Sequence, residues 1–160
     1  MLVAFKELPE SSRVWIYQAD QRLSEKDIEF ILAKATIFCD QWAAHNVPLK
    51  SSFNILHNKF LILAVDEGQN AASGCSIDSS VHFVQTVEKQ LNLNFFDRTQ
   101  VAFLIDDNVY TTDLQSIKDD IESGTIAADT MTFNMQAENV AEFQENWLVP
   151  AGESWMKKYF

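Results

Sequence analysis

The chain is poor in the residues that interrupt or cross-link a fold. Its 160 residues include only four Gly, three Pro and two Cys. So few breakers leave little room for linkers, and the sequence contains no repeat, low-complexity tract or domain boundary. An apolar fraction of 47% is too high for a disordered chain. We therefore expect one globular domain over residues 1–160.

Basic residues are also scarce, since 12 Lys and Arg face 23 Asp and Glu and the net charge is −11. Nucleic-acid and anionic membrane surfaces require clustered basic side chains, so we predict neither as a partner. No apolar run is long enough to span a bilayer, and the N-terminus lacks a signal-peptide pattern. Cys39 and Cys75 form no CxxC pair, so we expect reduced thiols and a soluble, cytoplasmic protein.

The apolar pattern predicts alternating strands and helices. Ser24 is expected to cap the first helix, whose apolar stripe includes Cys39 as a core residue. Asp78 or Ser76 is expected to cap the second helix. The predicted strands are residues 13–18, 53–57, 60–65, 101–105 and 130–134. The predicted helices run from 24 to near 45, from 77 or 81 to 91, from 112 to 123 and from 137 to 147.

The order of these elements in the first two-thirds of the chain is that of a split β-α-β, or ferredoxin-like, fold. We therefore predict an α+β fold with a mostly antiparallel sheet, helices packed on it and a C-terminal extension. Right-handed crossovers would place strands 13–18 and 60–65 in the centre of the sheet. Strands 53–57 and 101–105 would flank them.

This topology collects chemically active side chains at one end of the sheet, here called the rim. The rim would contain Arg13, Trp42, His45, Asp66, Glu67, Cys75, Asp78 and Asp106. Such a mixture is typical of a functional site, although strand ends and loops are polar in any protein. We predict a binding site around the loop from Asp66 to Asp78. The predicted ligand-binding residues are Arg13, Trp42, Asp66, Glu67 and Asp78.

A cysteine-dependent enzyme is the first alternative, with Cys75 as the nucleophile and His45 as the base. The start of a helix favours the thiolate form of cysteine, whereas neighbouring carboxylates disfavour it. No local signature of a known catalytic cysteine surrounds Cys75. Acyl transfer or redox chemistry therefore stays open beside a structural cysteine in a tight turn.

A divalent-metal-dependent hydrolase is the second alternative. The candidate oxygen ligands are Asp66, Glu67, Asp78, Asp106 and Asp107. In the predicted sheet, two strand spacings of about 5 Å each separate Asp66 from Asp106, and Arg13 lies between them. No metal site is therefore predicted. The Walker A and GxGxxG patterns are missing, so we predict no nucleotide cofactor and no ATPase activity.

The chain resembles a known family in five stretches that span nearly its whole length. They are residues 14–18, 42–45, 65–67, 71–78 and 154–160, of which Ala-Ser-Gly-Cys-Ser-Ile-Asp at 72–78 is the most specific. On these stretches the chain is similar to a family of short, uncharacterised bacterial proteins, some of which carry the label "ABC transporter ATPase". The resemblance implies no catalytic residues, and the missing Walker A motif contradicts the label.

We therefore predict a binding or accessory protein, not an enzyme, with an unknown small molecule or protein as its partner. The aromatic tail from Trp155 to Phe160 is expected to dock either on its own domain or on a second copy, which would make a homodimer.

Overall fold

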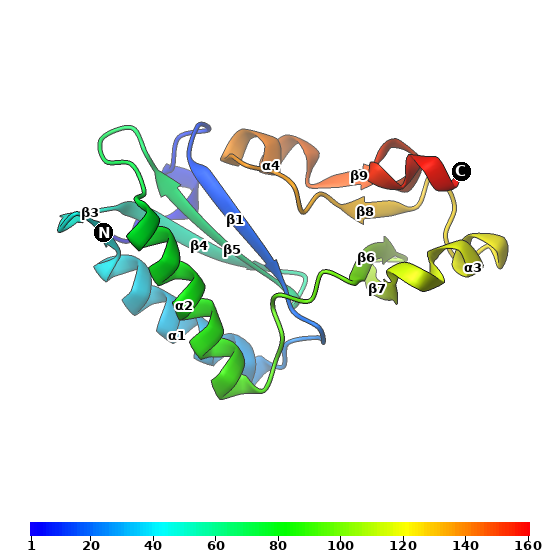
Figure 1. Ribbon diagram of the computed structural model, residues 1–160, viewed down its shortest axis with the longest axis horizontal. Coiled ribbons are helices and arrows are strands. Elements are labelled where there is room, and N and C mark those ends of the chain that lie inside the picture. Colours follow the sequence, from blue (N-terminus) through cyan, green and yellow to red (C-terminus); the bar gives the residue numbers. More distant parts are fainter.

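The structure is a computed structural model that describes residues 1–160, and it is an α+β fold with antiparallel sheets (Figure 1). The predicted fold class is thereby confirmed. The first sheet has the order β1-β5-β4, from Arg13–Gln18, Phe60–Asp66 and Lys50–Leu56. The second has the order β7-β6-β8-β9, from Asn108–Asp113, Gln100–Ile105, Met131–Phe133 and Leu148–Pro150. A small hairpin joins β2 (Ala43–Ala44) to β3 (Val47–Pro48). The α-helices are α1 (Glu25–Gln41), α2 (Gly74–Leu91), α3 (Ile117–Glu122) and α4 (Val140–Asn146).

Strand β5 is buried on both faces and forms the centre of the molecule. Its side chains alternate between two cores because successive residues of a strand point to opposite faces. One core, with Leu61 and Leu63, includes residues of α1 and α2. The other, with Phe60 and Ile62, includes residues of α4 and of the second sheet. The first sheet is therefore the middle layer, with helices on one face and the C-terminal half on the other (Figure 1).

Both long helices begin at serine caps. The hydroxyl oxygen of Ser24 accepts a hydrogen bond from the backbone N–H of Asp27, and the carboxylate of Asp27 accepts one from the backbone N–H of Ser24. Ser24 is thus the cap that the sequence predicts for α1. The cap of α2 is Ser73, so the prediction of Asp78 or Ser76 was wrong. Helix α1 ends at Gln41, earlier than expected, because the chain turns into the β2–β3 hairpin with His45 at its tip.

The strand predicted at 101–105 exists, but it was assigned to the wrong sheet. It pairs with β7 on one side and β8 on the other, and not with β1. Asp106 and Asp107 have φ of 50° and 61° and turn the chain straight back into β7. The helix predicted from residue 112 consequently begins only at Ile117, because Thr112 and Asp113 belong to β7.

The C-terminal tail docks on its own domain. Met156 is fully buried in a third core with Phe103 of β6 and Ile117 of α3. Trp155 and Phe160 remain 44% and 46% exposed, so their rings still present apolar surface. None of the helices combines the length and the apolar composition that a bilayer-spanning segment requires.

The positive φ angles of Asp106 and Asp107, between β6 and β7, predict which side chains these two positions tolerate. Asp107→Gly should leave the free energy of unfolding unchanged or raise it by up to about 1 kcal/mol, because glycine prefers this conformation. Asp107→Val should lower it by about 1–2 kcal/mol, because a β-branched residue is strained there. Chemical denaturation measures both changes. Asp113→Val is the control, since Asp113 has φ −75°; an equal loss there would contradict the conformational explanation.

Candidate functional site

The structure brings most of the predicted rim residues to one end of the first sheet. Arg13 pairs with Val65, so β1 begins where β5 ends. The indole of Trp42 donates to the carbonyl of Ser76, which joins the end of α1 to the start of α2. Asn70 donates to the carbonyl of Val47, so the loop lies against the hairpin that carries His45. Asp106 is the exception, because it lies in the turn between β6 and β7 of the second sheet.

The polar rim side chains mainly hold their own loop. Asp66 accepts from the backbone N–H of Gly68 at 2.9 Å and pairs with Lys50 at 3.9 Å. Glu67 accepts from the N–H of Ala72 at 2.9 Å. These carboxylates satisfy backbone donors that the turn would otherwise leave free.

Two further rim residues, Trp42 and Arg13, pack against aromatic rings of the first core. Trp42 is almost fully buried and packs at a tilt against the rings of Phe38 and Trp15. The guanidinium of Arg13 lies 4.9 Å from the centre of the Trp15 ring. Trp42 thus contributes to the core, and Arg13 covers the aromatic surface beside it.

Cys75 and His45 are both exposed, and no hydrogen bond joins them. Cys75 lies in the first turn of α2 and Asp78 is an exposed residue one turn later. No group of three or more His, Cys, Asp or Glu side chains is arranged to hold a metal ion. The geometry of the rim therefore supports neither the cysteine-dependent enzyme nor the metal-dependent hydrolase.

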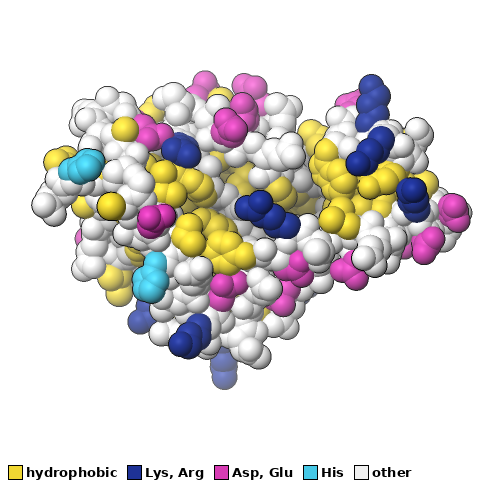
Figure 2. Space-filling view, in the orientation of Figure 1, with side chains coloured by type: hydrophobic (Ala, Val, Ile, Leu, Met, Phe, Trp, Pro, Cys, Tyr) yellow, Lys and Arg dark blue, Asp and Glu magenta, His cyan; other side chains and the backbone are white.

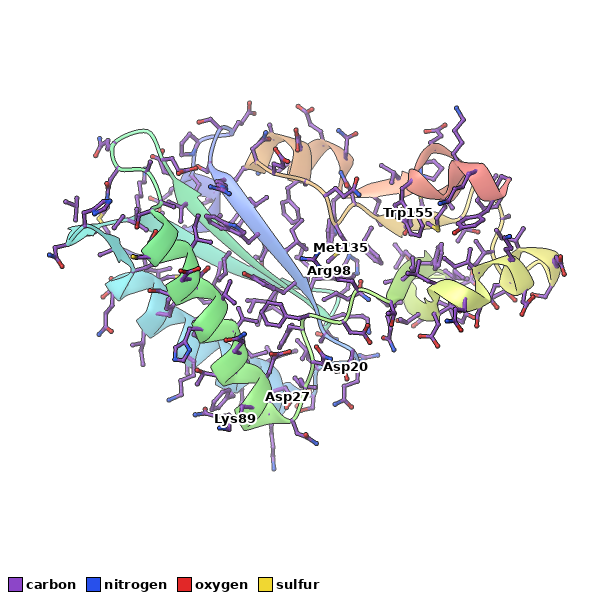
Figure 3. All side chains as sticks on the ribbon, in the orientation of Figure 1. Asp20, Asp27, Lys89, Arg98, Met135 and Trp155 are labelled. Atoms are coloured by element: carbon purple, nitrogen blue, oxygen red, sulfur yellow. The ribbon has the colours of Figure 1, made fainter.

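A large cleft lies elsewhere, between β1 and the second sheet. Its volume is about 690 Å³, and 14 of the 21 residues that line it are hydrophobic. Figure 3 shows Arg98 and Met135 in the space between β1 and the second sheet. The space-filling view shows hydrophobic side chains around a basic one near the middle of this face (Figure 2). None of the predicted site residues lines the cleft.

The edge of β1 borders the cleft along five consecutive residues, Val14 to Gln18. Because alternate side chains of a strand point to opposite faces, such a run means that the backbone edge faces the opening. The N–H of Val14 points away from β5, since it donates to the carbonyl of Glu138 at 3.0 Å. The antiparallel ladder then directs Ile16 and Gln18 outward and Trp15 and Tyr17 toward β5.

Outside the β1–β5 ladder, no backbone hydrogen bond involves Ile16 or Gln18, and the ladder register directs their N–H and C=O groups away from β5. Both ends of the cleft, by contrast, are closed by backbone contacts. At one end, the bond from Val14 to Glu138 joins β1 to the segment that follows β8. At the other, the N–H of Asp20 donates to the carbonyl of Asn94 at 2.8 Å. The open stretch of the edge is therefore short and lies inside the cleft.

Polar groups without strong partners point to ligand binding in this cleft. The Oε1 atom of Gln100 is buried without a hydrogen-bond partner, which is unusual in native proteins. Gln18 is only 8% exposed, and its amide makes a single long contact of 3.5 Å to the carbonyl of Gln100. Arg98 is exposed and forms no ion pair, although the protein is acidic.

Two titratable groups of the cleft, Asp97 and Tyr17, have pKa values shifted further away from neutral pH. Hydrogen bonds from the hydroxyl and backbone N–H of Thr99 lower the pKa of Asp97. Burial raises the pKa of Tyr17, and a hydrogen bond to Ser80 opposes that rise only in part. A general acid or base works best with a pKa near the working pH, which neither group approaches.

The sequence held only weak signals of this cleft. Its walls come mainly from residues 95–102, 132–138 and the β1 edge, which no local motif connects. Phe96 is 38% exposed, and a large ring at the surface marks an interaction site, but this exposure is a property of the structure that the sequence does not show. Compared with known proteins, the chain matches no family model, no curated protein and no solved structure.

The two cysteines should differ sharply in their reaction with a thiol reagent. Cys75 is exposed, whereas Cys39 is fully buried and burial raises the pKa of its thiol to about 12. Cys75 should label rapidly because it is exposed, and Cys39 at least about a thousandfold more slowly, because its labelling requires opening of the core. Mass spectrometry of native and denatured protein measures both rates. In the Cys75→Ser variant Cys39 is the remaining thiol. Rapid labelling of this variant in its native state would contradict the burial of Cys39.

The open edge of β1 should be visible in amide hydrogen exchange. We expect Ile16 and Gln18 to exchange at least about tenfold faster than Trp15 and Tyr17, because only the latter two donate to β5. Two-dimensional NMR of the protein in deuterated water measures the four rates together. Equal protection at the four amides would mean that the cleft is closed in solution.

Proposed function

We propose that the protein is a non-enzymatic binding protein whose ligand lies in the cleft between β1 and the second sheet. This moves the proposed site from the loop between Asp66 and Asp78 to the opposite side of β1. The observation that carries the proposal is the unpaired backbone of Ile16, which faces an apolar cavity instead of a neighbouring strand. The unpaired N–H and C=O groups of a strand edge are a template for pairing with another chain, so a ligand that supplies partners for them is favoured.

The size and lining of the cleft support the same function. A volume of about 690 Å³ lies within the 300–1,000 Å³ range typical of ligand pockets. Such pockets combine apolar walls with a few polar groups that orient the ligand. Here the walls include Phe95, Phe133 and Met135, and the orienting groups are Gln100 and Arg98.

The charges in the cleft favour binding over catalysis. The pKa of Asp97 is lowered and that of Tyr17 is raised, so both keep one protonation state around neutral pH. Groups of this kind fix a ligand by hydrogen bonds and charge, and they do not exchange protons with it during a reaction.

A fluorescent apolar dye tests whether the cleft accepts a ligand. Anilinonaphthalene sulfonate brightens in apolar sites, and its anionic group suits Arg98. Val81 of α2 lines the cleft, so Val81→Trp should fill part of it and weaken dye binding by about tenfold or more. Gln85→Trp is the matched control, because Gln85 is exposed on the same helix and lies outside the cleft. Equal dye affinity in the two variants would overturn the proposal.

A further inference from the structure

We infer that the ligand is the C-terminal segment of a peptide, which adds as a strand to the edge of β1 and places its carboxylate at Arg98. This inference rests on the proposed function, because it names the class of ligand that the same cleft takes. The peptide would run parallel to β1. Each element of the inference follows from a separate feature of the cleft.

The first feature is the spacing of the free backbone groups. Ile16 offers both an N–H and a C=O to the cleft, and Gln18 offers an N–H two residues later. Outward-facing groups at every second residue are the pattern that a partner strand completes. Added strands bind through these main-chain bonds and obtain specificity from alternate side chains. Because the N–H of Val14 is already bonded, the free stretch from Trp15 to Gln18 has room for a peptide of about four residues.

The second feature is that the opposite edge of the same sheet is partly protected. On β4, Ser51 forms a parallel bridge with Leu2, so the N-terminal residues cover that edge. The N–H of Ile55, further along β4, is satisfied by the side chain of Asn54 at 2.9 Å. Proteins protect exposed edges because unpaired strands attract other chains. The edge of β1 differs from that of β4 because its open stretch faces an apolar cleft, which makes it a specific docking position for a strand.

The third feature is apolar surface on both sides of that edge. Val81 and Phe96 line the cleft on the side of α2, and Tyr17 packs edge-to-face on Phe96 at 5.5 Å. Met135 and Phe133 line it on the side of the second sheet. A strand between them would direct its alternate side chains to these two surfaces.

The fourth feature is the placement of opposite charges at the two ends. Glu138 stands where β1 begins, since its carbonyl accepts from Val14. Arg98 precedes Gln100, whose carbonyl meets the side chain of Gln18 where β1 ends. Neither the carboxylate of Glu138 nor the guanidinium of Arg98 forms an ion pair within the protein. A peptide parallel to β1 would bring its carboxylate to Arg98, and the charge-assisted bond would favour this direction.

The experiment uses a hexapeptide library with a free C-terminus, in which apolar residues (Val, Ile, Leu, Phe) alternate with Ser or Thr. Peptides retained by the 160-residue protein are identified by mass spectrometry. We expect a defined set to be retained by the wild type and by Gln85→Trp, and to be lost from Val81→Trp. If the two variants retain the same peptides, the peptide inference is wrong. The cleft itself would remain supported if the dye still distinguishes the same two variants.

The best retained peptide then tests strand addition and its direction. Binding should protect the amide of Ile16 from exchange, and N-methylation of the peptide bonds that face β1 should abolish binding. C-terminal amidation should weaken binding by about tenfold, as expected for loss of a charge-assisted hydrogen bond. Arg98→Gln should remove most of the difference between acid and amide without affecting the amidated peptide. An unchanged Ile16 amide would overturn strand addition, and an undiminished acid preference in Arg98→Gln would overturn the role of Arg98.

Discussion

The burial of β5 on both faces is the constraint on which the rest of the structure depends. The six side chains from Phe60 to Val65 are fully removed from water and alternate between two cores. Each large apolar side chain buried in this way contributes about 1.5–3 kcal/mol. Neither face of the first sheet can therefore stay open to solvent. Helices α1 and α2 cover one face, and the C-terminal half must cover the other (Figure 1).

The same constraint explains why the cleft exists. The second sheet contributes Ala102 and Phe133 to the core on the face of β5, so it packs above the first sheet and does not extend it. Strand β1 consequently keeps a free edge, except where Val14 bonds to Glu138. The candidate site is thus a product of layer packing: apolar walls come from two layers, and unpaired backbone comes from the strand between them.

Local pattern and long-range pairing differ in how far they can be predicted. The continuous apolar run at 60–65, the Ser24 cap and the buried Cys39 follow from local hydrophobic pattern and capping, which involve residues close in sequence. The strand at 101–105 was recognised, but its partner was not. The two-residue turn at Asp106 and Asp107 lets it pair at once with β7, and a short loop closes at a lower entropic cost than a pairing with β1.

The sequence by itself determined an acidic α+β chain, its main strands and helices, and the gathering of polar residues at the end of the first sheet. Only the tertiary structure decided which strand edge stays open and what surrounds it. The cleft joins β1 to segments near Phe96 and Met135 that are distant in the chain. Their side chains resemble ordinary core residues until packing leaves a volume between them. An unpaired Ile16 has no signature in composition, because its chemistry lies in the backbone that every residue shares.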